Sequence, residues 1–447
     1  MKKIILLFLF LAWHTTNHAQ WTTQDIGTGR FHLGAAATDS LLFFVGGTLN
    51  GLVPSAAVNI YNTNTQLWSQ TELSSRRSFP ATVATNDQVF VAGGNDIRTN
   101  GASKVVDIYD VATETWSQTE LSVARSGIAA VQVGDKVIFA GGGTIDAFLS
   151  GFHTSDVVDI YDLTTQTWDT ARLSQARFFM AATTAGDKAY FGGGVIDNNT
   201  MSKRVDIYDA TTDTWSIDSL SIERGLLAAT TVQNQVIFAG GHDADGVSLA
   251  DVDIYDTNTQ NWTTDQLSVP RMGAGAVTAC GKAYFLGGGD NDWDTKIVVG
   301  ANTQVDIYDP STATWTTDNL NAKRALAAAA ATDNTLAILG GFDPQSGIQN
   351  TAETLVCELI SHQEGWQQHP SWQIFPNPNS GQFTLATAQP YQQIILYDSC
   401  GKEIIRTTAN NTLERFDFSF LPKGLYWVIL QNESGMFSSK KIIIEGE

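Results

Sequence analysis

Short apolar stretches alternate with polar turns along most of the chain, and their order repeats. In one copy, residues 126–133 are largely apolar, residues 134–136 form a polar turn, and an apolar strand at 137–140 ends in glycines. A loop of variable length follows, then another apolar strand, a Thr-rich turn and a fourth strand that contains a Trp. Short β-branched and aromatic runs between turn residues predict a four-stranded antiparallel meander.

The repeat has a measurable period. Seven times, a Trp is followed after eight intervening residues by an Arg, and successive arginines are 47, 48, 52, 47, 47 and 53 residues apart. A period of about 50 that tolerates insertions is typical of one supersecondary unit copied around an array. The pairs are Trp21/Arg30, Trp68/Arg77, Trp116/Arg125, Trp168/Arg177, Trp215/Arg224, Trp262/Arg271 and Trp315/Arg324.

The repeat predicts an all-β propeller of seven blades. A single meander cannot bury both of its faces, so the copies must pack face to face around an axis. The last unit ends near residues 352–356 and has no Trp at the usual distance, whereas Trp21 has no unit in front of it. We therefore expect the segment around Trp21 to supply the outer strand of the last blade and to close the ring.

Several features of the unit resemble the Kelch family. These are the paired glycines, the V-D-I-Y-D strand of residues 106–110, the Trp near the repeat end and the Arg that opens the next unit. The resemblance covers roughly residues 21–360 and implies a Kelch-type β-propeller, which we assign to 20–360.

The pattern changes after a polar linker at 361–371. Residues 375–378 read F-P-N-P, and L-Y-D, L-P-K-G-L-Y and K-K-I-I-I follow in order. Alternating apolar strands predict a small Ig-like β-sandwich. The ordered motifs of residues 372–447 resemble the C-terminal sorting domain of type IX secretion cargo. The resemblance implies a Bacteroidetes-type bacterium, the type IX secretion machinery as a partner, and release or cell-surface attachment. An accessory Ig-like domain is the alternative.

The N-terminus predicts export by an independent signal. Lys2 and Lys3 precede an apolar stretch of ten residues at 4–13, which is too short to span a bilayer. We interpret residues 1–19 as a cleaved secretory signal peptide. No other segment reaches transmembrane length.

Charge narrows the choice of partners. The chain of 447 residues carries 26 Lys and Arg against 46 Asp and Glu, a net charge of -20. Such a surface repels nucleic acid and anionic lipid, so we expect no nucleic-acid partner. The three cysteines do not form a disulfide framework, and the sequence leaves open whether Cys280 and Cys357 pair.

The seven arginines are the first candidate site. In the predicted meander each Arg and the neighbouring glycine pair lie on one rim of the propeller, so the guanidinium groups would ring the channel and could bind a carboxylate, sulfate or phosphate. The alternative is that each Arg bonds a carbonyl or an acidic side chain of its own or the next blade. Repetition in every blade favours this alternative. The candidates are Arg30, Arg77, Arg125, Arg177, Arg224, Arg271 and Arg324.

Residues that break the repeat are better candidates. Two positions after the Arg, His32, Phe79 and Phe179 are the polar and aromatic departures. The loops after the glycines differ in every blade, and such insertions often bind ligands. One of them contains Trp293, which could stack on a sugar. It also contains Asp290, Asp292 and Asp294, which offer oxygen ligands for Ca²⁺. A full calcium-loop pattern is missing, which favours a solvated acidic loop.

The sequence favours binding over catalysis. A nucleophile elbow, a phosphate loop and a zinc motif are missing, and no His pair has metal-ligand spacing. We therefore expect no cofactor besides the Ca²⁺ alternative. The expected function is non-catalytic binding of a glycan, surface polymer or protein. A carbohydrate-active or oxidative Kelch enzyme and a purely structural surface protein remain as alternatives.

Overall fold

The computed structural model describes residues 21–357 and 373–444 with gaps. The gaps are 97–100, 146–151, 198–199, 293–296, 378–379, 387–392, 399–402, 409–412 and 432–436. The predicted signal peptide at 1–19 and the predicted linker at 361–371 lie outside the described residues. The described part is built of β-strands with one turn of 3-10 helix, Asn50–Leu52, which confirms the all-β prediction. None of its helices has the length and apolarity to span a bilayer.

Seven four-stranded antiparallel sheets lie between residues 22 and 356. From the inner to the outer strand, the first three blades are β2 (Gly34–Ala37), β3 (Leu41–Val45), β4 (Ala57–Asn62), β5 (Leu67–Glu72); β6 (Ala81–Ala84), β7 (Gln88–Ala92), β10 (Val105–Asp110), β11 (Thr115–Glu120); and β12 (Ala129–Val133), β13 (Lys136–Ala140), β16 (Val157–Asp162), β17 (Thr167–Arg172). The next two are β18 (Ala181–Ala185), β19 (Lys188–Gly192), β22 (Arg204–Asp209), β23 (Thr214–Ser219); and β24 (Ala228–Val232), β25 (Gln235–Ala239), β26 (Asp251–Asp256), β27 (Asn261–Gln266). The last two are β28 (Gly275–Ala279), β29 (Lys282–Leu286), β32 (Gln304–Asp309), β33 (Thr314–Asn319); and β34 (Ala328–Ala331), β35 (Thr335–Leu339), β38 (Thr351–Val356), β1 (Thr22–Asp25).

The innermost strands contact one another in a closed ring, in the order β2, β6, β12, β18, β24, β28, β34 and back to β2. Beyond its first residue, each second strand consists of apolar, aromatic or glycine residues, and all of these are buried. On β3, Leu42 and Phe44 pack against the seventh blade, whereas Phe43 and Val45 pack against the second. Each blade therefore shares its core with both neighbours, as a propeller requires.

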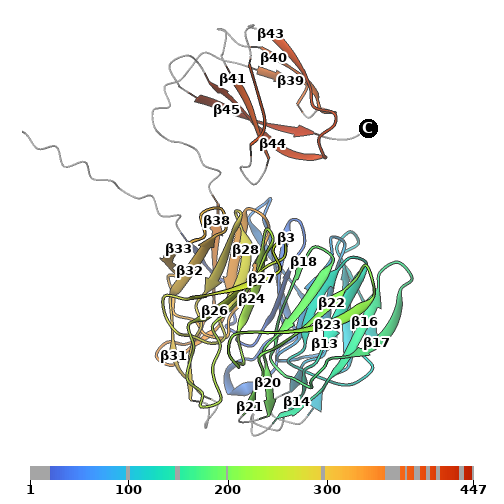
Figure 1. Ribbon diagram of the computed structural model, residues 1–447, viewed down its shortest axis with the longest axis vertical. Helices are drawn as coiled ribbons and strands as arrows, with labels where there is room; N and C mark the ends of the chain where they lie inside the picture. Colours follow the sequence, from blue (N-terminus) through green and yellow to red (C-terminus); the bar gives the residue numbers. More distant parts are fainter. Residues whose placement is uncertain are drawn as a thin grey trace, which may run out of the picture.

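The loops after the glycine pairs form short hairpins in five blades. Blades 1 and 5 carry instead the 3-10 turn and a turn after His242. The hairpins are β8 (Asn95–Asp96) with β9 (Gly101–Ala102), β14 (Gly143–Ile145) with β15 (Phe152–Thr154), β20 (Val195–Asp197) with β21 (Thr200–Met201), β30 (Gly289–Asp292) with β31 (Ile297–Ala301), and β36 (Phe342–Asp343) with β37 (Gly347–Ile348). Figure 1 shows the blades standing side by side, with β14, β20, β21 and β31 at the lower end of the propeller.

The N-terminal strand closes the ring, as predicted. Strand β1 pairs antiparallel with β38, from Thr22 opposite Thr354 to Asp25 opposite Thr351. Trp21 is buried, and its indole Nε1 donates to Asp318 Oδ2 of the sixth blade at 3.0 Å.

The same contact recurs between other blades. The indole of a blade donates to the residue three positions after the Trp of the preceding blade. The pairs are Trp116 with Thr71, Trp168 with Thr119, Trp262 with Asp218, Trp315 with Asp265 and Trp21 with Asp318. Trp21 therefore occupies the position of the seventh blade's own Trp.

A disulfide joins the last two blades. Cys280 follows β28 and Cys357 follows β38, and their Cα atoms are 6.1 Å apart. The pairing that the sequence left open is thus present in the structure. It connects the sixth blade to the last described residue of the propeller.

The C-terminal segment contains two sheets with one shared core. One sheet comprises β39 (Gln373–Phe375), β40 (Gln382–Ala386) and β43 (Leu413–Asp417), and the other comprises β42 (Glu403–Thr408), β41 (Gln393–Asp398), β44 (Gly424–Gln431) and β45 (Phe437–Ile444). Phe383 and Phe416 of the first sheet pack with Leu396 and Val428 of the second. The segment is therefore a small β-sandwich.

Candidate functional site

The seven repeat arginines lie inside the blades. In the third blade, Arg125 is 1% exposed, and its Nη1 donates to the carbonyl oxygens of Gly141 at 2.5 Å and Val157 at 2.6 Å. Its Nη2 donates to Asp159 of the V-D-I-Y-D strand. Each guanidinium thus ties the start of its blade to the first glycine, the third strand or both.

The acid that pairs with the Arg has a second task. Asp159 Oδ1 accepts a hydrogen bond from the backbone N–H of Ser122 at 3.0 Å, three residues before Arg125. Asp206, Asp253 and Asp306 accept the same bond from Ser174, Ser221 and Ser268. The Asp therefore holds both ends of the turn that leads from the preceding blade into its own blade.

The first blade departs from this pattern. Arg30 donates to the side-chain oxygen of Asn59, where the other blades supply an Asp or, in blade 7, Glu353. Burial lowers the pKa of Arg30 to about 10. Among the described residues, the hydrogen-bond partners of the buried Arg30 guanidinium are the neutral oxygens of Gly46, Ala57 and Asn59.

The seven residues that lie two positions after the arginines form a ring around the axis. All have a left-handed backbone, with φ between 51° and 58°. Six backbone N–H groups in this ring donate to the carbonyl of an adjoining blade, at 3.0 to 3.4 Å. Two members are glycines, and five carry side chains: His32, Phe79, Phe179, Leu226 and Leu326.

The two glycines leave room for their neighbours. A Cβ on Gly127 would lie 2.5 Å from the ring of Phe178, and one on Gly273 would lie 2.6 Å from Leu326. The other five positions hold bulky side chains in a conformation that costs non-glycine residues free energy.

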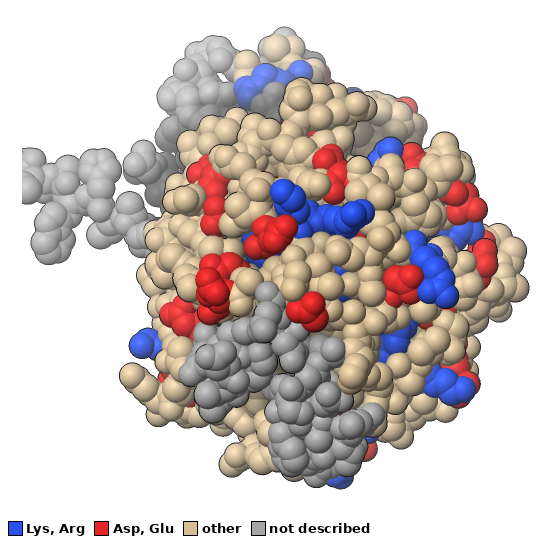
Figure 2. Space-filling model, turned by 60° about the horizontal axis from the view of Figure 1, so that its bottom comes forward, with Lys and Arg blue, Asp and Glu red and all other residues tan. Residues whose placement is uncertain are grey.

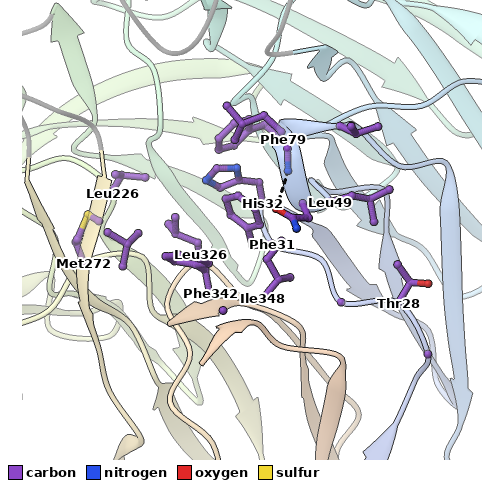
Figure 3. A pocket seen from close by; sticks show the side chains of 18 of the residues that line it. Thr28, Phe31, His32, Leu49, Phe79, Leu226, Met272, Leu326, Phe342 and Ile348 are labelled. Atoms are coloured by element: carbon purple, nitrogen blue, oxygen red, sulfur yellow. Dashed lines mark hydrogen bonds between the residues drawn. The ribbon is translucent and has the colours of Figure 1, made fainter. Parts of the chain in front are cut away.

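A cavity of about 820 Å³ lies over this ring, at the mouth of the channel. Figure 3 shows Leu226 and Leu326 on one side of it and Phe79, His32 and Phe31 on another. The two chain ends of the propeller and the first blade also contribute. The remaining described lining residues are Gly27, Thr28, Gly29, Leu49, Asn50, Gly51, Leu52, Val53, Phe179, Met272, Val298, Phe342, Gly347 and Ile348.

Aromatic rings form a continuous arc along one side of the cavity. Ring centroids are 5.8 Å apart between Phe342 and Phe31, 4.3 Å between Phe31 and His32, and 3.8 Å between His32 and Phe79. Phe179 continues the arc at 5.2 Å from Phe79. The arc spans blades 7, 1, 2 and 4, so it depends on ring closure.

His32 is a neutral member of this arc. Its Nδ1 lies 3.3 Å from Thr48 Oγ1, and burial lowers the pKa of its imidazole to about 3. At neutral pH the ring is uncharged and stacks on Phe79. It can contribute a polar edge, but not a positive charge, to the cavity.

None of the described lining residues is a Lys, Arg, Asp or Glu. On the face that Figure 2 shows, acidic and basic side chains are interspersed among other residues. The seven candidate arginines do not appear among the described lining residues, because their side chains point into the blades. The arrangement supports their alternative role, which is to hold each blade together.

Other candidates are only partly described. Trp293 and Asp294 lie outside the described residues, as does the side chain of Asp292, while Asp290 is exposed on β30. The calcium site remains a prediction, and in the described part of the chain no group of three or more His, Cys, Asp or Glu residues could hold a metal ion.

Sequence reasoning missed part of the aromatic arc. Phe31 directly follows its Arg, and Phe342 directly follows its glycine pair; these two positions pair across each blade, as in Phe31 with Thr48 and Ala325 with Phe342. Aligning these two columns of the repeat would have singled them out, because Ser, Gly and Thr occupy half of the equivalent positions in the other blades.

Comparisons with known proteins agree with this fold. Residues 81–264 match the KLHDC2/KLHL20/DRC7 Kelch-repeats domain, and residues 373–445 match a secretion system C-terminal sorting domain. The chain thus carries Kelch repeats followed by a type IX secretion sorting domain, as the sequence predicted. It is an exported protein that is secreted or attached to the cell surface.

A solved structure titled "Structure of YjhT" is similar in fold. It shares 15% identity with this chain at a TM-score of 0.52, and the match covers 66% of this chain and 99% of the other. No curated protein matches the sequence.

Proposed function

We propose that the propeller is a non-catalytic binding module whose ligand occupies the channel mouth. The observation that carries the proposal is the conformation of the ring residues. Gly127 and Gly273 occupy the left-handed positions of two blades without strain, whereas His32, Phe79, Phe179, Leu226 and Leu326 adopt the same φ with a side chain. Such strain costs on the order of 1 kcal/mol or more at each position and clusters at functional sites.

The chemistry of the lining supports binding over catalysis. General acid–base work needs a group that titrates near the working pH. His32 is the one titratable side chain in the described lining, and burial holds its pKa far below neutrality. The enzyme alternative has no such group in that lining to carry a proton.

The proposal is tested by filling the cavity. Ile348 is a half-buried lining residue on β37, and Ile348→Trp should occupy much of the space. Ile217→Trp is the matched control, because Ile217 is 57% exposed on β23 in an outer strand. Wild type and both variants would be screened on a glycan array and against a panel of small molecules by thermal shift.

We expect at least one ligand that Ile348→Trp loses and Ile217→Trp keeps. That ligand should be recovered chemically unchanged after prolonged incubation with the protein. Ligands that bind both variants equally would contradict binding at the channel mouth, and conversion of the ligand would favour the enzyme alternative.

A further inference from the structure

We propose that the channel-mouth cavity binds an uncharged, largely apolar small molecule. This inference rests on the proposed function and narrows the chemistry of its ligand. A cavity of about 820 Å³ is within the usual size of sites that enclose a small ligand. Three properties of its described lining argue for this class of ligand: its charge, its supply of polar groups and its two apolar walls.

The first property is the lack of a charge partner. In a chain with a net charge of -20, none of the described lining residues is charged. Arg30 is the cation next to Phe31, but its guanidinium is turned to Gly46, Ala57 and Asn59 and is 1% exposed. An ionised ligand would lose its hydration without gaining an ion pair, which is costly.

The second property is the small number of polar side chains. Thr28, His32 and Asn50 are the polar side chains of the described lining. Two of them already have partners, since His32 Nδ1 faces Thr48 Oγ1 at 3.3 Å and Asn50 Oδ1 accepts from the Gly51 N–H at 2.9 Å. A sugar with several hydroxyl groups would leave many of them without a hydrogen bond, which disfavours a glycan.

The third property is the pair of apolar walls. Phe342, Phe31, His32, Phe79 and Phe179 form the aromatic arc. Leu226, Met272, Val298, Leu326 and Ile348 supply aliphatic surface to the same cavity. A flat apolar ring system could stack on the arc while its other surface contacts the aliphatic side chains.

Two dyes that differ by one charged group provide the test. N-phenyl-1-naphthylamine is neutral, and 8-anilino-1-naphthalenesulfonate has the same aromatic skeleton with an added sulfonate. Both would be titrated into the full-length mature protein, and binding would be followed by fluorescence. We expect saturable binding of the neutral dye at one site, with the sulfonate weaker by roughly tenfold or more.

Variants test whether the dye binds in the cavity. Ile348→Trp and, independently, Leu49→Trp should abolish binding of the neutral dye, whereas Ile217→Trp should bind it like wild type. Ile348→Lys should narrow the difference between the dyes by raising the affinity for the sulfonate. Circular dichroism and thermal melting of each variant show whether it is folded, and two filling positions keep the test valid if one variant misfolds.

The outcomes separate the ligand class from the site. Equal or tighter binding of the sulfonate, lost in both filling variants, would overturn the uncharged ligand and leave the channel mouth as the binding site. Binding of both dyes that neither folded filling variant changes would overturn the site itself, and with it the proposed function.

Discussion

Asn59 sets the first blade apart at the scale of single residues. The V-D-I-Y-D strand gives five blades an Asp that pairs with the buried Arg, and the seventh blade supplies Glu353. In the first blade Arg30 faces the neutral Asn59 instead, and no described carboxylate pairs with it. Each of these arginines is therefore a buried residue with several hydrogen-bond partners. Its contribution to the free energy of unfolding depends on the acid that pairs with it.

Two substitutions of the residue opposite the Arg, Asn59→Asp and Asp107→Asn, should change the free energy of unfolding in opposite directions. Asn59→Asp gives Arg30 the carboxylate that its counterparts have, and we expect about 1–3 kcal/mol of added stability. Asp107→Asn leaves Arg77 as an unpaired buried charge and should cost about 3–5 kcal/mol. Urea unfolding at neutral pH measures both. A stabilising Asp107→Asn would contradict the assigned role of the pairs.

His32 should make stability depend on pH. Burial lowers the pKa of its imidazole from 6.5 to about 3, so the folded state resists the proton that the unfolded chain accepts. Stability should therefore fall as the pH decreases from about 6.5 towards 3, by up to ~1.4 kcal/mol per pH unit from this residue.

His32→Phe isolates that contribution. Phe occupies the equivalent position at Phe79 and Phe179, with the same left-handed φ, so the backbone accepts the change. Denaturant unfolding between pH 4 and pH 7 should show a shallower loss of stability in the variant than in wild type. Parallel curves would mean that His32 is not a buried neutral group.

Much of the residue-level site was readable from the sequence, but not all of it. His32, Phe79 and Phe179 stood out because they interrupt a repeated column, and the structure places all three in the cavity lining. For the arginines the sequence favoured bonds to the backbone or to an acid within the blades, but it could not identify Asp107 and its equivalents as the acids that pair with them. The left-handed φ of the ring could be suspected only where Gly occurs.

At the scale of elements, closure of the propeller depends on β1. It pairs with β38 across more than 300 positions of sequence, and Trp21 takes the place of the last blade's Trp. The sequence predicted this pairing because the repeat left one Trp too many at the start and one too few at the end. It could not predict the hairpins, since the loops after the glycines share no pattern.

Removing β1 should open the propeller. Deletion of residues 21–25 exposes the edge of β38 and removes the buried Trp21 side chain, a loss of about 3–5 kcal/mol or more. Trp21→Phe is the milder control, because it keeps an aromatic ring and loses the bond to Asp318, at about 1 kcal/mol. Thermal melting that is the same for the deletion and wild type would contradict closure by β1.

The disulfide is a second closure between elements. Cys280 and Cys357 are 77 residues apart in the sequence, and the chain-entropy model gives a cross-link of this separation about 4.5 kcal/mol of stability. The double variant Cys280→Ser, Cys357→Ser should melt earlier than wild type, and a reducing agent should lower the melting temperature of wild type alone. An equal effect of the reductant on both proteins would contradict this expectation.

At the scale of the whole molecule, the sorting domain and the propeller have different parts in the account: the first directs export, and the second carries the cavity for which we propose a binding role. The sorting domain matches residues 373–445 and directs export, while the Kelch repeats carry the cavity. The sequence revealed both domains because their motifs are ordered and repeated. It could not reveal the chemistry of the cavity, which is assembled from residues as distant as Gly27 and Ile348.

Truncation should separate these roles. A chain that ends before residue 372 lacks the sorting domain but keeps every strand of the propeller from β1 to β38. We expect it to fold and to accumulate in the periplasm of a host with the secretion machinery, as judged by fractionation and protease protection. Normal secretion or surface display of the truncated chain would contradict the role of the domain.

The central claim is that the channel-mouth cavity, with the aromatic arc along one side, binds an uncharged ligand. A crystal structure of the full-length mature protein with N-phenyl-1-naphthylamine tests it most directly. The account predicts the dye inside the cavity, with one ring against Phe79 or Phe179 and contacts to Leu326 or Ile348. Dye bound elsewhere on the molecule, with the channel mouth filled by protein side chains, would contradict it.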